Sequence, residues 1–151
     1  ETLLAEYAAT WMERRRLQGK PLGSWMSDEE RLRKWILPVF GQRILQRITS
    51  PELEAHLDRL VTKEGLSAGT RNRVRAALHK LYNDAKRQGL IPHNPVSNMV
   101  VWKEKTQVFD YWQTMDECLA YLQAAEKESP CFYVFAILAL NTGARVGELI
   151  A

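Results

Sequence analysis

Cysteine is scarce in this chain, and neither Cys118 nor Cys131 has a histidine or another cysteine at the spacing of metal ligands. Two cysteines in 151 residues exclude a disulfide framework and a zinc finger. Long apolar runs are missing too, since the longest, residues 131–140, is about half of what a membrane span needs. No segment fits a secretory signal. These absences predict a reduced, cytoplasmic protein without a metal site.

The composition is that of an ordinary globular protein, with 46% hydrophobic and 26% charged residues. Charge is uneven along the chain. Residues 1–100 carry 17 Lys and Arg against 11 Asp and Glu, whereas residues 101–151 carry 4 against 7. This asymmetry predicts two units, the first of which faces a polyanion. The alternative is that the basic residues only keep the surface soluble.

Helical periodicity runs through most of the chain and predicts an all-α fold. A first helix is expected over 3–18, and a second is expected to open at the capping box 27–30 and to close at Pro38. A third begins at the start signal 49–52 and stops at Gly65. Ser67 caps the fourth, which ends near Gly89. Its apolar stripe is formed by Val74, Ala77, Leu78, Leu81, Tyr82 and Ala85.

The helical period is lost from about residue 98 to residue 112, and this stretch is interpreted as a linker. A capping box at Thr114 then starts another helix. Ser129 and Pro130 begin the next, which is apolar nearly all round and is expected to lie in a core. The predicted organisation is therefore a four-helix domain over 1–97, a linker over 98–112, and the first helices of a second domain over 113–151.

One arginine stands out near the end of the chain. After the expected buried helix, the glycine turn at Gly143 would present Arg145 at the start of a further helix, where free backbone N–H groups favour anions. The guanidinium fork donates two parallel hydrogen bonds to a phosphate and keeps its proton. The alternative is a surface arginine beside an ordinary helix cap.

The spacing Thr142-Gly143-x-Arg145-x-x-Glu148-Leu149 resembles the box that holds the first catalytic arginine of the tyrosine site-specific recombinases, the phage integrase family. The stretch from Gly65-Leu66-Ser67-x-x-Thr70 to Asn94-Pro95 is similar to the last helix of that family's core-binding domain. The box at Thr114 and Glu117 resembles the start of its catalytic domain.

The resemblance implies an all-α, SAM-like core-binding domain followed by the opening helices of a truncated α+β catalytic domain. Arg145 would clamp the scissile phosphate and Glu148 would support the fold around it. The implied parent reaction is DNA integration and recombination through a 3′-phosphotyrosyl intermediate, with neither ATP nor a metal as cofactor. The family's other catalytic groups, including the nucleophilic tyrosine, find no match in this chain, which is expected not to cut DNA. The parent is expected to act as a tetramer on DNA, and these residues as a monomer.

Double-stranded DNA is the expected partner, contacted first by the fourth helix. Asn72, Arg75 and His79 share one face at helical spacing, and Arg71, in the first turn, is expected to reach outward. Further candidate contacts are Arg73, Lys80 and Arg87 on the other side of this helix, and Lys103 and Lys105 in the linker. The alternative for these residues is a solvated basic face.

Two other functions remain open at this stage. One is a non-enzymatic helical DNA-binding module or regulator that shares this fold. The other is a protein–protein interaction domain whose basic face is incidental.

Overall fold

In the computed structural model, which describes residues 1–18, 22–104, 112 and 114–150, the chain divides into two compact units, 1–105 and 106–151. Within these described ranges every regular element is a helix, apart from one isolated bridge between Leu3 and Ile44. The expected all-α architecture is confirmed. None of the helices that the structure describes is long and apolar enough to cross a membrane.

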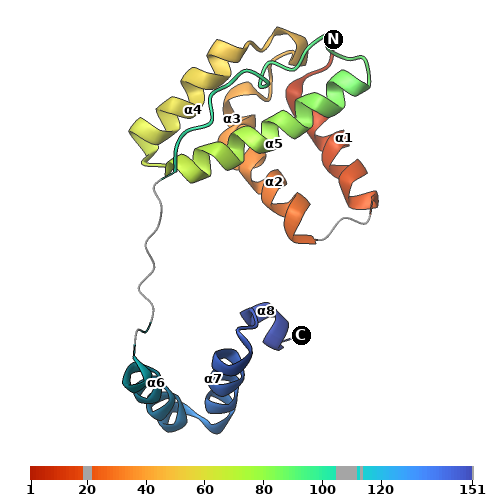
Figure 1. The fold of residues 1–151 in the computed structure, drawn as a ribbon. Coiled ribbons are helices and arrows are strands. Elements are labelled where there is room, and N and C mark those ends of the chain that lie inside the picture. Colours follow the sequence, from red (N-terminus) through yellow and green to blue (C-terminus); the bar gives the residue numbers. More distant parts are fainter. Residues whose placement is uncertain (19–21, 105–111, 113, 151) are drawn as a thin grey trace. The chain divides into compact units, whose positions relative to one another are not determined.

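The first unit is built around α5, which packs against both α2 and α4 (Figure 1). Its helices are α1 (Leu4–Leu17), α2 (Leu22–Trp35), α3 (Leu37–Phe40), the 3-10 helix η1 (Leu45–Arg47), α4 (Ser50–Glu64) and α5 (Ala68–Arg87). The apolar stripe expected on α5 is fully buried, with Tyr82, Val74 and Leu78 each 0% exposed. These side chains meet Trp11 of α1 and Leu57 of α4 in one core.

Local chemistry sets the ends of α4 and α5 as expected. Thr49 and Glu52 form a capping box at the start of α4, and Gly65 ends it in the left-handed conformation at φ 69°. The Ser67 hydroxyl accepts from the Thr70 N–H at 3.1 Å and caps α5. The hydrogen bond from Arg43, with further ones from Thr49, lowers the pKa of Glu52 to about 2.

The expected start of α2 at Ser27 is wrong, because the helix already begins at Leu22. All three acidic residues of the supposed capping box lie inside the helix, and two of them, Asp28 and Glu29, are buried. Asp28 accepts a hydrogen bond from Arg15 at 3.2 Å, and Glu29 accepts two from Arg16 at 3.1 and 3.2 Å. Their carboxylates therefore join α2 to α1 and do not cap a helix.

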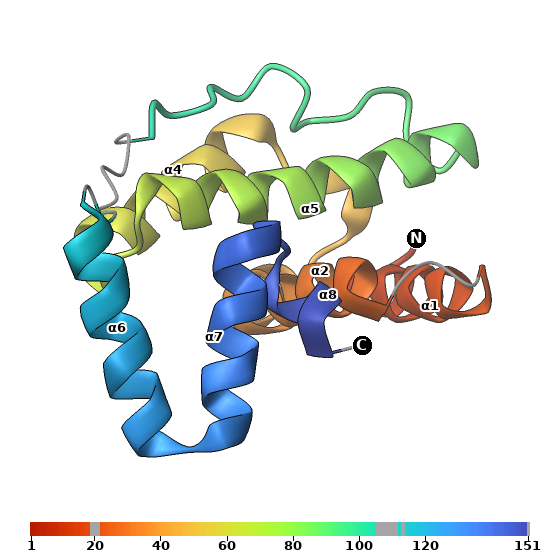
Figure 2. The ribbon, with the colours of Figure 1, turned by 60° about the horizontal axis from the view of Figure 1, so that its bottom comes forward.

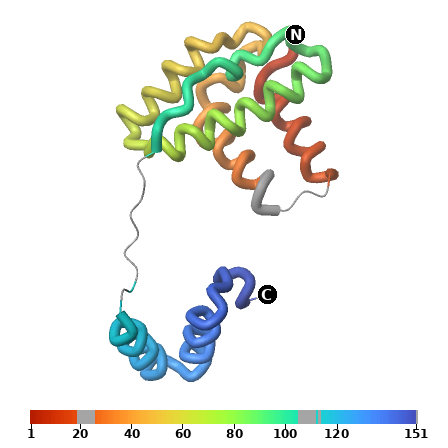
Figure 3. The backbone as a smooth tube through the Cα atoms, in the orientation of Figure 1, coloured from red at the N-terminus to blue at the C-terminus, as the bar shows by residue number. Residues whose placement is uncertain are grey.

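After α5 the chain turns at Gly89, whose φ is 73°, and runs back along α5 (Figures 1, 2 and 3). We call residues 90–104 the return segment. Val96 and Met99 bring it into the core of the first unit. Residues 98–104, interpreted from the sequence as linker, thus lie in the first unit, because buried side chains and polar groups of α5 hold them there.

The second unit contains α6 (Met115–Glu128), α7 (Pro130–Thr142) and α8 (Val146–Ile150). Thr114 and Ser129 cap α6 and α7 as expected. Apolar side chains of α7 are nevertheless exposed, with Val134 at 55% and Leu138 at 48%. The expected burial of α7 in a core is therefore not found, since only α6 and α8 pack against it in the described part of this unit.

Candidate nucleic-acid interface

Arg71, the first of the expected DNA contacts, is completely buried at 0% exposure. Asp58 Oδ1 accepts from its Nε at 2.9 Å and from its Nη2 at 2.8 Å, and the Val100 carbonyl accepts from Nη1 at 3.0 Å. The guanidinium also stacks on the ring of Trp102, 4.3 Å from its centroid. The expectation that Arg71 reaches outward is wrong. A carboxylate on α4 and the return segment together satisfy its charge within the fold.

The neighbouring polar residues of α5 also hold the return segment. The Asn72 amide donates to the Trp102 carbonyl at 2.8 Å and accepts from the Trp102 N–H at 3.0 Å. Arg75 Nε donates to the Met99 carbonyl at 2.9 Å. The face that carries Asn72 and Arg75 is therefore covered by the chain itself, and the Asn72 hydrogen bonds would have to break before its amide could read a base.

The other expected contacts lie in more open positions. Arg73 and Lys103 are exposed. His79 is half-buried and its Nδ1 lies 3.3 Å from the Asn83 amide. The Lys80 ammonium donates to Asp28 at 2.8 Å while its side chain stays 47% exposed. Lys105 lies outside the described residues.

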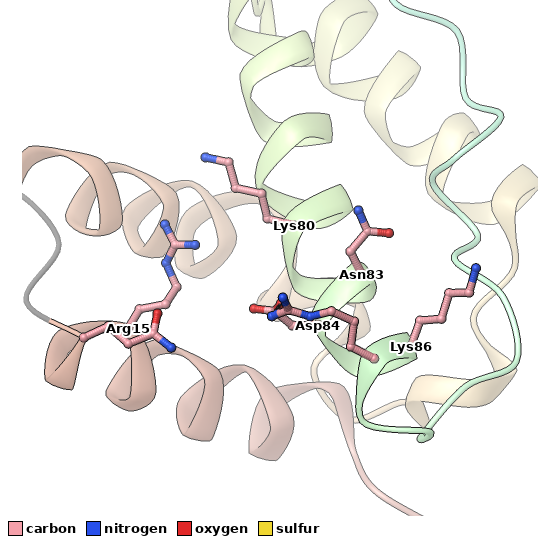
Figure 4. Close-up of a pocket in the computed structure, with 7 residues that line it drawn as sticks. Arg15, Lys80, Asn83, Asp84 and Lys86 are labelled. Atoms are coloured by element: carbon pink, nitrogen blue, oxygen red, sulfur yellow. Dashed lines mark hydrogen bonds and ion pairs between the residues drawn. The ribbon is translucent and has the colours of Figure 1, made fainter.

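Polar contacts link the last part of α5 to α1, which crosses it at a steep angle (Figure 4). Gln88 donates to the Tyr7 hydroxyl at 2.9 Å, and Trp11 Nε1 donates to Asp84 Oδ2 at 2.6 Å. One turn further along α1, Arg15 shares the Asp28 carboxylate with Lys80. Burial and the nearby Asp84 carboxylate raise the pKa of Tyr7, so its hydroxyl stays protonated and accepts from Gln88.

These two helices border a hollow of about 760 Å³ (Figure 4). We call it the α1–α5 hollow, and it is lined by Arg15, Gln18, Lys80, Asn83, Asp84, Lys86 and Arg87. Arg15, Gln18 and Lys86 of this lining are not among the contacts predicted from the sequence. The periodicity of one helix carries no signal for such a site, because the site depends on how α1 and α5 align.

Arg145 lies in the turn between α7 and α8. Gly143 ends α7 at φ 63°, and the next helix begins at Val146. The Glu148 carboxylate accepts from the Arg145 backbone N–H at 2.9 Å and lies 3.4 Å from its Nη1. The Arg145 side chain is 88% exposed, so its guanidinium is open to an anionic ligand.

Residues 4–89, more than half of the chain, match the family described as phage integrase, N-terminal SAM-like domain. The chain belongs to the phage integrase family. The matched range ends at Gly89, just after α5, and takes in every helix of the first unit. The SAM-like fold that the sequence resemblance implied is thereby confirmed.

Two curated integrases align with this integrase-family chain over nearly all of its length. The integrase of Enterobacteria phage 434 is 33% identical over 148 residues, which cover 93% of this chain and 39% of that protein. The ICEBs1 integrase of Bacillus subtilis is 23% identical over 150 residues, covering 99% of this chain and 39% of that one. The chain thus spans about two fifths of the length of these relatives.

Solved structures with the same fold include lambda integrase. A lambda integrase (75-356) dimer bound to a COC′ core site aligns with a TM-score of 0.75 and 26% identity, over 97% of this chain and 52% of that one. The integrase-like domain from Bacillus cereus aligns with a TM-score of 0.61 and 20% identity, over 74% of this chain and 95% of that one.

Proposed function

We propose that this chain is the DNA-binding part of a phage-type integrase, a tyrosine recombinase that joins DNA segments at specific sites. The observation that carries the proposal is the basic first unit of an integrase-family chain, in which cations of α1 and α5 line one hollow. Double-stranded DNA is the proposed partner, and the neighbours crystallised on DNA support it. A cytoplasmic location and a tetrameric full-length protein belong to the same proposal.

Contacts to DNA are assigned to cations that keep exposed surface, namely Arg73, Lys80 and Lys103. Such residues neutralise phosphates and position the protein without reading the sequence. Arg71, Asn72 and Arg75 support this surface by fixing the return segment. His79 remains a proposed DNA contact, but one of its ring nitrogens already lies within hydrogen-bond distance of Asn83.

The second unit is proposed to deliver Arg145 to the scissile phosphate. An exposed guanidinium at the first turn of a helix can donate two hydrogen bonds to the charge that develops in phosphoryl transfer. Glu148 holds the backbone beside it and acts as a positioning residue. No feature of the described residues favours the non-enzymatic alternative or the interaction domain.

Fluorescence anisotropy on labelled duplex DNA tests the proposal. Affinity measured across a salt series should fall linearly on logarithmic axes, with a slope of about −0.9 for each phosphate contacted. A slope steeper than about −2.7, which corresponds to three or more phosphates, is the expected result. Absence of binding at low salt, or affinity independent of salt, would overturn the proposal.

A further inference from the structure

The α1–α5 hollow gathers more positive charge than its surroundings neutralise. Of the described residues that line it, four are cationic, Arg15, Lys80, Lys86 and Arg87, and one, Asp84, is a carboxylate. Beneath them the buried Asp28 carboxylate accepts from Arg15 and Lys80, and Arg31 lies 3.4 Å from it. The lining cations together with these two carboxylates leave a formal net charge of +2. An anion in this hollow would be attracted by the excess.

Two cations of the hollow, Lys86 and Arg87, are exposed enough to bind a ligand. The Lys86 side chain is exposed, and its ammonium forms no hydrogen bond or ion pair within the described part of the chain. Arg87 forms an ion pair with Asp84, yet its side chain is 77% exposed. Asp84 in turn accepts from Trp11, so its charge is shared between two donors.

The length of the hollow suits several phosphates of one strand. Lys80 and Arg87 are seven positions apart on α5, a rise of about 10 Å at 1.5 Å per residue. Successive phosphates of one strand of duplex DNA are about 3.4 Å apart along the helix axis. The cations of α5 could therefore follow two or three phosphates in a row.

The lining also indicates what part of the nucleic acid would be bound. Among the described residues, no aromatic side chain lines the hollow, so they offer no platform on which a base could stack. Every lining residue is polar or charged. We propose that the α1–α5 hollow is a subsite for consecutive backbone phosphates of one DNA strand. This proposal rests on the proposed function and extends the contacts predicted from the sequence, which included Lys80 and Arg87, to Arg15 and Lys86 of the same hollow.

A different role for these cations would be to stabilise the helix ends. Arg15 lies in the last turn of α1, and Lys86 and Arg87 lie in the last turn of α5, where positive charge favours the helix dipole. A dipole role changes the stability of the fold and leaves the salt dependence of DNA binding unchanged. The subsite changes the salt dependence, so one measurement separates the two roles.

The experiment compares two double variants of the 151-residue chain that lose the same two positive charges. K86Q/R87Q empties the hollow of two cations, and R59Q/K63Q removes two exposed cations from α4, outside the hollow. For K86Q/R87Q the salt slope of duplex DNA binding should become shallower by about 1.8, because two phosphate contacts are lost. For R59Q/K63Q the slope should remain within error of wild type. Circular dichroism verifies that both variants are folded.

The second part of the experiment adds a positive charge to the hollow. Gln18→Lys adds a cation to the hollow and should make the slope steeper by about 0.9, whereas Gln46→Lys on η1 should not. Equal slopes for the two double variants, or no change with Gln18→Lys, would overturn the subsite while leaving DNA binding intact. A wild-type chain that does not bind DNA would instead overturn the proposed function and the subsite with it.

Discussion

The Arg71 guanidinium of α5 donates to the Asp58 carboxylate of α4 at 2.8 Å, and the two ends of this pair differ sharply in exposure. The Arg71 side chain is 0% exposed, whereas that of Asp58 is 42% exposed. Loss of the carboxylate leaves a buried cation with less compensation, while loss of the arginine leaves an acid that water can solvate. The pair is therefore asymmetric in its expected contribution to stability.

The first prediction follows from that asymmetry. Asp58→Ala should lower the free energy of unfolding by about 3 kcal/mol, the lower end of the range for breaking a buried pair, since Glu54 still lies 3.9 Å from Arg71. Urea denaturation monitored by circular dichroism measures the change. Glu64→Ala, an exposed position on the same helix, should stay within about 0.5 kcal/mol of wild type. Equal losses for the two variants would contradict the assignment of Arg71 as a buried, paired charge.

A second prediction concerns the return segment. Asn72→Ala removes the acceptor of the Trp102 N–H and the donor to its carbonyl, so hydrogen exchange of the Trp102 amide should accelerate at least tenfold. Arg73→Ala, the adjacent exposed position, is the control and should leave that amide unchanged. Unaltered exchange in Asn72→Ala would mean that α5 does not hold residues 99–102 in solution.

The third prediction is a dependence of stability on pH. The Glu52 carboxylate has a pKa of about 2 in the folded chain, below its ordinary value of 4.5, because Arg43 and Thr49 donate hydrogen bonds to it. A lowered folded pKa gives stability that is complete above about pH 4.5 and is lost as the pH falls toward 2. The difference in melting temperature between wild type and Glu52→Gln should therefore shrink across this window. The same difference for Glu64→Gln, an exposed site on α4, should be small at every pH, and a constant gap for Glu52→Gln would refute the link.

Local sequence chemistry predicted much of the first unit, and long-range packing explains the errors. The ends of α4 and α5 follow from the capping box at Thr49, Gly65 and the Ser67 cap, whose partners lie within a few residues. The same kind of signal at Ser27 failed, because α2 already begins at Leu22 and Ser27 lies inside it.

The candidate site was harder to predict than the helices. Helical periodicity correctly placed Asn72, Arg75 and His79 on one face, but the chain that covers Asn72 and Arg75 comes 24 to 32 positions later. The α1–α5 hollow depends on the contact of Trp11 with Asp84, 73 positions apart. Neither long-range contact produces a periodic pattern in the sequence, so both could be recognised only in the folded structure.

The most direct test of DNA binding by the first unit is a titration of the ¹⁵N-labelled chain with a short duplex, followed by amide NMR spectra. The account predicts that the shifted amides cluster at residues 15–18 and 80–87, which border the α1–α5 hollow, and at the proposed contacts Arg73 and Lys103. The outward face of α4 should stay unperturbed. Spectra that do not change, or shifts that leave the first unit unaffected, would contradict it.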